Sequence, residues 1–273
     1  MTNSKAGVAG FPMYDLPEVR GALDSLWAAL AKELRAAGST HLPAGLLHDE
    51  PLNRLWHDQA LFVSQCCGYD LVNRHIGVLC PLVTPRYTAP GCDGTDYCSH
   101  IVVAKNSEIK EIAAARGRVC AINGFESHSG MNALRTLVAP FHRQGKFFSR
   151  VWVSGTHAAS LAAVARGEAD ICAIDCVTHA LLAHHRPAAL AGTRILCRSA
   201  AAPAIPFVTR VDRGGEFAEC LQTALMDVLK DPTLAEVRQE LLIEGGEILP
   251  PGEYDRIAEF ETQAAAAGYP HLR

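Results

Sequence analysis

Two kinds of hydrophobic pattern follow one another along the chain. Apolar residues between positions 23 and 34 recur every three or four places, which predicts a helix with one buried face that ends at Gly38. Shorter apolar runs have the length of buried strands. These predicted strands cover 6–11, 61–64, 76–83 and 99–104. The first part of the chain therefore combines strands and helices.

The middle of the chain has the most regular pattern. Strands and helices are predicted to alternate there, beginning and ending with a strand, over 118–123, 127–137, 150–154, 156–166, 170–174, 176–185 and 194–198. Strands that are linked through helices pair in parallel with right-handed crossovers. After Pro206, a short strand at 207–209 is followed by helical segments near 215–229, 234–242 and 254–267. The sequence therefore predicts an α/β fold with mostly parallel sheets.

Polar side chains collect where these strands end, which is where open α/β sheets bind ligands. Ser127, His128 and Ser129 stand between the strand at 118–123 and its helix. Backbone N–H groups are free at a helix start, and the helix dipole favours an anion there. A serine in this place can equally be an ordinary helix cap. These three residues are candidate anion ligands.

Other strand ends carry similar chemistry. His157 begins the next helix and can donate a hydrogen bond to an oxyanion, although a histidine at a helix start is often only a surface residue. Asp175 ends the third strand of this region and can accept a hydrogen bond from a ligand or cap its own helix. In the first part of the chain, hydroxyl, amide and phenol groups come from Ser64, Gln65 and Tyr14. Their recurrence at successive strand ends indicates a ligand site.

Composition and charge restrict the class of protein. Hydrophobic residues make up 49% of the 273 positions and charged residues 20%, which is typical of a folded globular chain and not of a disordered one. The formal net charge of -4 and the lack of a basic stripe argue against a nucleic-acid partner. No apolar run reaches the roughly 18–20 residues that span a membrane, and residues 1–7 lack a signal-peptide pattern. A cytoplasmic location is therefore expected, or a periplasmic one if a leader has been removed.

The ten cysteines indicate neither a metal site nor a disulfide framework. They are scattered, without a paired Cys-x-x-Cys, and are expected to be reduced and mostly buried. Cys172, Cys176 and His179 are close in sequence, but the first lies in a predicted strand and the second starts a helix, so we expect no metal. Cys66 can act as a nucleophile at a helix start but is more typical of a small buried thiol. Glycine-rich phosphate loops are missing, and no cofactor is expected.

Several segments together resemble a known family. They are 11–17 (FPMYDLP), 64–69 (SQCCGY), 121–135 (AINGFESHSGMNALR), 153–161 (VSGTHAASL) and 167–178 (GEADICAIDCVT). In this combination, over about residues 7–209, the chain resembles the phosphonate-type substrate-binding proteins of ABC transporters. The resemblance implies a two-lobed type II periplasmic-binding-protein fold, in which each lobe is a mostly parallel sheet flanked by helices. The lobes would be 1–101 with 205–273 and 102–204, joined by two crossing strands near 99–104 and 199–207.

The same resemblance implies roles for the candidate residues. Residues 127–129 would hold the oxyanion of the ligand at helix N-termini of the second lobe. His157 would donate to the oxyanion, Asp175 would accept from the ligand, and Tyr14 would close over it from the first lobe. One departure is His128, because the family often has a small hydroxyl residue there. A protonated histidine in that place would strengthen anion binding at low pH.

These features predict a binding protein without chemistry of its own. It would hold a phosphonate, phosphate or similar small oxyanion in the cleft between its lobes, as a monomer, and would serve an ABC permease or act as a cytosolic sensor. The alternative is an enzyme of the same fold that acts on a small carboxylate or a cofactor precursor. Asp175 or Glu126 would then be its acid or base, with His157 or Cys66 as further candidates. The effector half of a regulator is disfavoured because no DNA-binding segment precedes the fold.

Overall fold

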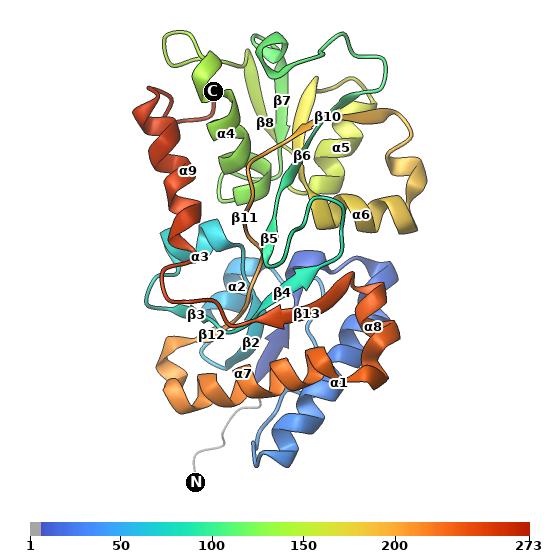
Figure 1. Cartoon of the computed structure of the whole chain (residues 1–273), viewed down its shortest axis with the longest axis vertical. Coiled ribbons are helices and arrows are strands. Elements are labelled where there is room, and N and C mark those ends of the chain that lie inside the picture. The colour runs from blue at the N-terminus through green and yellow to red at the C-terminus, as the bar shows by residue number, and fades with distance from the viewer. Residues whose placement is uncertain (1–6) are drawn as a thin grey trace. The chain divides into compact units, whose positions relative to one another are not determined.

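The computed structural model describes residues 7–273 and divides the chain into two α/β units (Figure 1). One unit contains the chain up to Thr88 together with Ala204–Pro251, and the other contains Ala89–Pro203 together with Gly252–Arg273. The N-terminal stretch in which a leader was sought, and the first position of the predicted strand 6–11, lie outside the described residues. The α/β fold predicted from the sequence is confirmed.

The first unit is built on a sheet in the order β1-β2-β12-β3. Its strands are β1 (Val8–Gly10), β2 (Leu61–Gln65), β12 (Phe207–Arg210) and β3 (Leu79–Pro81). Among the described residues of this sheet, β12 alone runs against its neighbours, whereas β1 and β2 are parallel. The remaining pair is β4 (Thr84–Tyr87) with β13 (Ile243–Glu247), and the helices are α1 (Arg20–Ala36), α2 (Leu52–His57), α3 (Gly68–Arg74), α7 (Gly215–Lys230) and α8 (Ala235–Glu240).

Helix α1 has the buried face that its apolar spacing predicts. Leu23, Leu26, Leu30 and Leu34 are all buried, and the ring of Trp27 packs edge-on against Phe62 of β2 with centroids 6.3 Å apart. The helix ends where the sequence indicates, because Gly38 has a φ of 87° that L side chains rarely adopt. The Ser39 N–H then donates to the carbonyl of Leu34, which satisfies the helix end.

The second unit is built on a sheet in the order β10-β6-β9-β7-β8. Its strands are β6 (Ser99–Ala104), β7 (Val119–Ile122), β8 (Arg150–Val153), β9 (Ile171–Asp175) and β10 (Thr193–Arg198). β7 is parallel to both β8 and β9, and β6 is antiparallel to β9 and β10. In the described chain four of the five strands run in one direction and β6 runs against them, so two of the four pairings are parallel and two are antiparallel, and the sheet is mixed rather than mostly parallel as expected. The short pair β5 (Asp96–Tyr97) with β11 (Ala202–Pro203) and the helices α4 (Ala133–Val138), α5 (His157–Ala165), α6 (Cys176–His185) and α9 (Asp255–Ala266) complete this unit.

The boundaries between the units differ from the expected ones. β6 pairs with β9 and β10 along its length, so residues 99–104 belong to the second sheet and are not a crossing strand. The chain passes between the units after Thr88, after Pro203 and after Pro251. The expected crossing near 199–207 contains the second of these points.

The C-terminal helix α9 also belongs to the second unit and not, as expected, to the first. It lies along α4 (Figure 1). The Thr136 hydroxyl donates to the carbonyl of Phe260 at 2.7 Å, and the Asn132 side chain donates to the carbonyl of Ile257 at 3.1 Å. These bonds therefore tie α9 to the segment 132–136 of the same unit.

Replacing Arg135 with methionine is expected to destabilise the second unit. Arg135 is only 3% exposed, and its guanidinium donates to Asn132 Oδ1 at 2.6 Å and to the carbonyl of Pro270 at 2.9 Å. Methionine has a similar length but leaves both acceptors unpaired, so the free energy of unfolding should fall by about 2 kcal/mol. Urea unfolding followed by circular dichroism measures this loss.

The matched control is Arg166→Met, on the surface of the same unit. Arg166 forms an exposed ion pair with Glu168 at 2.8 Å, and its loss should cost less than about 1 kcal/mol. Equal losses in the two variants would show that the buried bonds of Arg135 do not hold α4 to the C-terminal segment.

Candidate functional site

The carboxyl ends of β9, β7 and β8 lie next to one another at one edge of the second sheet, because the three strands are adjacent and parallel. Asp175 ends β9, the segment 123–129 follows β7, and His157 begins the helix after β8. The structure therefore brings these three strand ends of the second unit together.

The turn after β7 is shaped by small residues. Ser127 caps it, since its Oγ accepts from the Gly130 N–H at 3.0 Å, and a π-helical turn follows over His128–Asn132. The Ser99 hydroxyl of β6 donates to the carbonyl of Ser129 at 2.8 Å and holds the turn against the sheet. A Cβ at position 130 would lie 1.8 Å from Asn123 Oδ1, so a side chain larger than that of glycine does not fit without movement.

Ser129 and His157 are in direct contact. Ser129 Oγ and His157 Nε2 are 3.0 Å apart. Burial lowers the pKa of His157 to about 4, although the nearby carbonyl of Ala173 acts in the opposite direction, so the imidazole is neutral at pH 7. A neutral imidazole and a hydroxyl each offer one hydrogen-bond donor. We call Asn123, Ser127, Ser129 and His157 the serine–histidine cluster.

Asn123 was not singled out from the sequence, although it ends the predicted strand 118–123. Its Oδ1 is buried and has no hydrogen-bond partner within the described part of the chain. A buried carbonyl oxygen without a partner is costly, so it marks a place where a further donor fits. The sequence did contain a signal for Asn123: its amide side chain stands at the carboxyl end of a predicted strand, as the carboxylate of Asp175 does at the end of another.

His128 lies in the core of the second unit. Its ring packs edge-on against Phe260, with centroids 4.9 Å apart, and lies 6.1 Å from the ring of Tyr97. Its Nδ1 accepts a hydrogen bond from the Asn132 side chain at 3.2 Å. Burial first, and then the charge of Arg135, lower the pKa of His128 to about 3. The expectation that a protonated His128 strengthens anion binding at low pH is therefore wrong.

Asp175 acts as a helix cap, one of its two expected roles. Its Oδ1 accepts from the backbone N–H groups of Val177 at 2.8 Å and Thr178 at 2.9 Å, at the start of α6. The carboxylate is almost completely buried. Asp175 also pairs with Ser99 in the sheet register, which places it at the same sheet edge as the serine–histidine cluster.

Two of the three candidates of the first unit, Gln65 and Tyr14, contact Tyr87. Gln65 Nε2 donates to the Tyr87 hydroxyl at 3.4 Å, and the Tyr14 ring packs edge-on against Tyr87 with centroids 5.3 Å apart. Gln65 Oε1 is buried and has no hydrogen-bond partner in residues 7–273. Ser64 is buried next to Gln65 and donates to its carbonyl at 3.3 Å. Tyr87 was not singled out from the sequence, because it ends β4 (Thr84–Tyr87), which lies outside the predicted strands.

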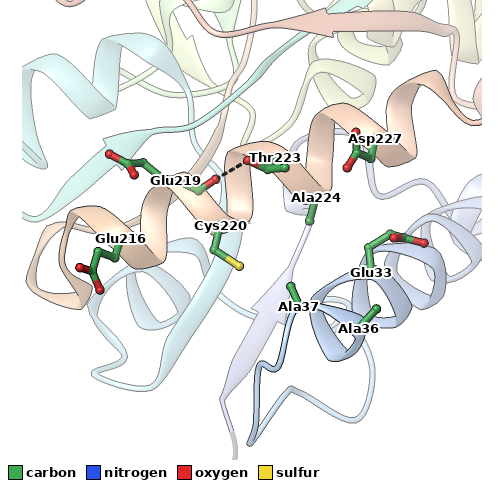
Figure 2. A pocket seen from close by; sticks show the side chains of 9 residues that line it. All are labelled: Glu33, Ala36, Ala37, Glu216, Glu219, Cys220, Thr223, Ala224 and Asp227. Carbon is green, nitrogen blue, oxygen red and sulfur yellow. Dashed lines mark hydrogen bonds between the residues drawn. The ribbon is translucent and has the colours of Figure 1, made fainter.

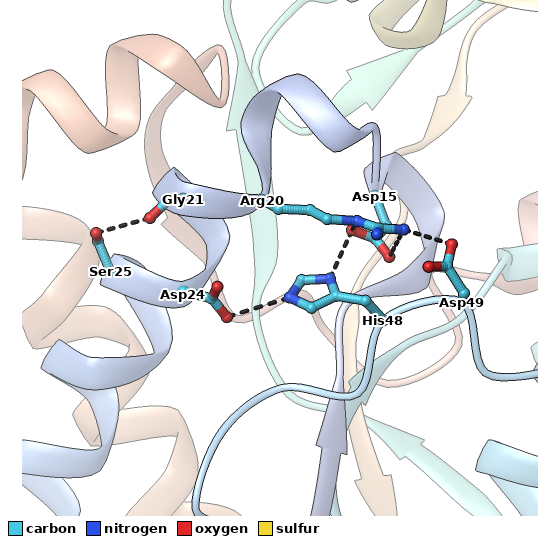
Figure 3. A network of polar contacts seen from close by, with 7 residues as sticks. All are labelled: Asp15, Arg20, Gly21, Asp24, Ser25, His48 and Asp49. Carbon is cyan, nitrogen blue, oxygen red and sulfur yellow. Dashed lines mark hydrogen bonds and ion pairs between the residues drawn. The ribbon is translucent and has the colours of Figure 1, made fainter.

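A charged network fixes the segment that carries Tyr14 (Figure 3). Asp15 Oδ1 accepts from Arg20 Nε at 3.0 Å and from His48 Nδ1 at 2.7 Å. The other ring nitrogen of His48 lies 3.2 Å from Asp24, and Arg20 also binds Asp49. The network therefore joins the start of α1 to the loop before α2.

This network should make stability depend weakly on pH. Burial lowers the pKa of His48, but its hydrogen bonds to Asp15 and Asp24 raise it by more, so the pKa lies above its ordinary value of 6.5. The stabilisation is complete below that ordinary pKa, which the unfolded chain has, and is lost as the pH rises through the raised pKa of the folded protein. We expect less than about 1 kcal/mol, because the pair is partly solvated.

Chemical denaturation at several pH values above 6 measures this contribution. His48→Gln should remove it, whereas the exposed His271→Gln should leave it intact. An unchanged pH dependence in His48→Gln would mean that the charged form of His48 is not stabilised by its two aspartates.

Two hollows of the first unit contain none of the predicted residues. One lies between α1 and α7, and Figure 2 shows its acidic side chains, which are Glu33, Glu216, Glu219 and Asp227. The other contains Arg213, which already donates to the carbonyls of Leu61 and Ala60. Acidic walls repel an anion, and a cation that is already hydrogen-bonded attracts one weakly.

Two of the four residues named for an enzyme, Cys66 and Glu126, are poorly placed for catalysis. Cys66 is fully buried, and burial raises its pKa well above the ordinary value, which disfavours the nucleophilic thiolate. Glu126 is an exposed loop residue.

Among residues 7–273, no helix combines the length and the apolar character that crossing a membrane requires.

Comparison with known families gives a clear match. The model of a family described as "ABC transporter, phosphonate, periplasmic substrate-binding protein" matches residues 59–249. No curated protein sequence matches the chain significantly.

Solved structures of low sequence identity share the fold. A binding-protein component of an ABC phosphonate transporter from Pseudomonas aeruginosa has 15% identity and a TM-score of 0.75, covering 97% of this chain and 88% of its own. A Prochlorococcus marinus protein in complex with methylphosphonate has 15% identity and a TM-score of 0.72, with coverage of 95% and 98%. A Xanthomonas citri protein bound to ATP has 16% identity and a TM-score of 0.72, with coverage of 98% and 100%.

Proposed function

Because the chain belongs to the periplasmic substrate-binding proteins of phosphonate ABC transporters, we propose that it binds a small phosphonate or a similar oxyanion for delivery to a permease. Proteins of this family bind and hand over a substrate; they are not enzymes. The match covers most of the chain, including segments of both units.

The contact between Ser129 Oγ and His157 Nε2, at 3.0 Å, is the observation that carries the proposal. Both groups stand at helix starts, where free backbone N–H groups and the helix dipole favour an anion. The two side chains make a bond to each other that an oxyanion can replace, since it accepts from both. Ser127 and the unpaired Asn123 Oδ1 add a hydroxyl and an acceptor for a protonated phosphonate oxygen.

Methylphosphonate is the first ligand to test, because the Prochlorococcus marinus protein of the same fold holds it. We propose that Tyr14, Ser64 and Gln65 add contacts from the first unit. The unpaired Gln65 Oε1 supports this role, since it can accept from a ligand hydroxyl or ammonium group. Asp175 keeps its function as the cap of α6, and we propose that its carboxylate also accepts from the ligand.

The proposed location is the periplasm, where the permease partner of such proteins presents its outer face. Expression of the full-length gene product, followed by separation of periplasmic and cytoplasmic fractions, tests the location. Recovery in the cytoplasmic fraction alone would support the cytosolic sensor instead.

Thermal-shift measurements test the ligand. The panel is phosphate, phosphite, sulfate, methylphosphonate, aminoethylphosphonate, ATP and small carboxylates, with calorimetry on each positive compound. A ligand at 100 times its dissociation constant adds about 2.7 kcal/mol of stability, which raises the melting temperature by several degrees. A response to a phosphonate or phosphate supports the proposal. A response to carboxylates alone, or to none of the oxyanions, would overturn it.

A further inference from the structure

A pair of thiols lies at the start of α6, outside the serine–histidine cluster. Cys176 is the first residue of this helix and is fully buried. Cys92 belongs to the segment between β4 and β5 and is half-buried. The two Sγ atoms are 3.5 Å apart, which is van der Waals contact between sulfur atoms. The anion-binding proposal makes no use of this pair.

The surroundings hold the two thiols in this contact. Gly91 has a φ of 119° and turns the chain sharply, so that Cys92 faces α6. A Cβ at Gly91 would lie 2.8 Å from Cys98 Sγ, 3.1 Å from the Cβ of Cys176 and 3.1 Å from the ring of buried His100. The tight packing leaves the Cys92 turn little room to move away from Cys176.

We propose that Cys92 and Cys176 are a redox-active dithiol that closes to a disulfide by exchange with a small external disulfide such as oxidised glutathione. Cys92 is the more exposed of the two and reacts first. Its thiolate attacks the external disulfide, forms a mixed disulfide and releases one thiol. Cys176 then attacks the Cys92 sulfur and releases the second thiol. Two electrons pass to the external disulfide, and the two cysteine protons end on the two released thiols.

The position of the bond gives it a structural effect. The disulfide would join the segment that contains Cys92, just after the chain enters the second unit at Ala89, to the start of α6. A long loop closed by a disulfide restricts the unfolded chain, so the melting temperature should rise by about 5–10 °C. The contact with Cys92 raises the pKa of Cys176, and burial adds to this, although a hydrogen bond with Cys98 acts in the opposite direction, so closure of the disulfide should become faster as the pH rises.

The test uses the purified full chain, incubated with oxidised glutathione at pH 8, alkylated with N-ethylmaleimide in denaturant and mapped by peptide mass. We expect a peptide pair linked through Cys92 and Cys176, lighter by two hydrogen atoms, and a higher melting temperature that dithiothreitol reverses. Cys92→Ser should abolish both changes. Cys176→Ala should instead retain one glutathione on Cys92, because the second attack is missing.

Cys197→Ser is the matched control, since Cys197 is a half-buried cysteine of the same unit that lies in β10. It should leave both changes intact. Full alkylation of all ten cysteines after oxidation, a disulfide that uses Cys98 in place of Cys92, or glutathione that stays on Cys92 of the wild-type protein would each overturn the proposal. None of these readouts depends on anion binding, so this result and the ligand result are independent.

Discussion

Replacing His157 with alanine is expected to weaken methylphosphonate binding by about 10- to 100-fold, the cost of removing one hydrogen bond to a charged group. His157 is held by Ser129 at 3.0 Å, so its N–H is oriented before the ligand arrives. Its pKa of about 4 keeps the imidazole neutral, and affinity should therefore stay constant between about pH 6 and 8, as far as this residue is concerned. Isothermal calorimetry of wild type and variant measures the loss.

Ser129→Ala should give a smaller loss in the same direction, because the hydroxyl is a weaker donor and His157 remains. His271→Ala is the control: it removes an exposed histidine of the same unit that lies outside the serine–histidine cluster. Circular dichroism should show that all three variants are folded. Unchanged affinity in both cluster variants would move the anion site away from the carboxyl ends of β7 and β8.

The three histidines with the most strongly lowered pKa should together destabilise the protein by about 6 kcal/mol, or about 2 kcal/mol each, when the pH falls from 7 to 5. Burial is the first cause that lowers the pKa of His128 to about 3 and of His100 and His157 to about 4. The unfolded chain takes up protons on these residues near pH 6.5 and the folded protein does not. The stabilisation is therefore present above pH 6.5 and is lost as the pH falls towards the folded values.

Urea unfolding at pH 7, 6 and 5 measures this slope. His128→Asn removes one of the three titrations and should lower the slope below pH 6 by about 1.4 kcal/mol per pH unit, equivalent to one proton. The exposed His271→Asn should leave the slope unchanged. The same slope in His128→Asn and wild type would mean that His128 takes up its proton in the folded state as well.

The sequence predicted the elements of the second unit well because each is short and clearly bounded. The predicted helix 156–166 is α5 (His157–Ala165), and the Thr156 hydroxyl caps it by accepting from the Ala159 N–H at 3.0 Å. Gly167, just after the helix, has a φ of 74° that favours glycine. Here a capping hydroxyl and a glycine after the helix set its ends, and both can be recognised in a single sequence.

Strand direction and helix partners were not predictable in the same way. The apolar run 99–104 gives the same pattern whether a strand is parallel or reversed, and only the sheet shows that β6 runs against β9. The amphipathic helix at 254–267 shows that one face is buried but not which unit buries it. Its hydrogen-bond partners Thr136 and Asn132 are more than a hundred residues away in the sequence.

The candidate site shows the same limit on a smaller scale. Ser127, Ser129 and His157 were singled out by their place at helix starts, and the structure brings Ser129 and His157 into contact. His128, between the two serines, turns into the core and bonds to Asn132 within the π-helical turn. Sequence spacing does not tell which way a side chain leaves such a turn, because the turn departs from the regular helical period.

The return of the chain to the second unit after Pro251 has a consequence for biosynthesis. The backbone N–H groups of Phe147 and Phe148 donate to the carbonyl of Arg273, at 2.7 and 3.1 Å, and Arg135 reaches Pro270. A ribosome must therefore have released residues 252–273 before the second unit can complete its core. Until then the backbone N–H groups of Phe147 and Phe148 lack their acceptor, the carbonyl of Arg273.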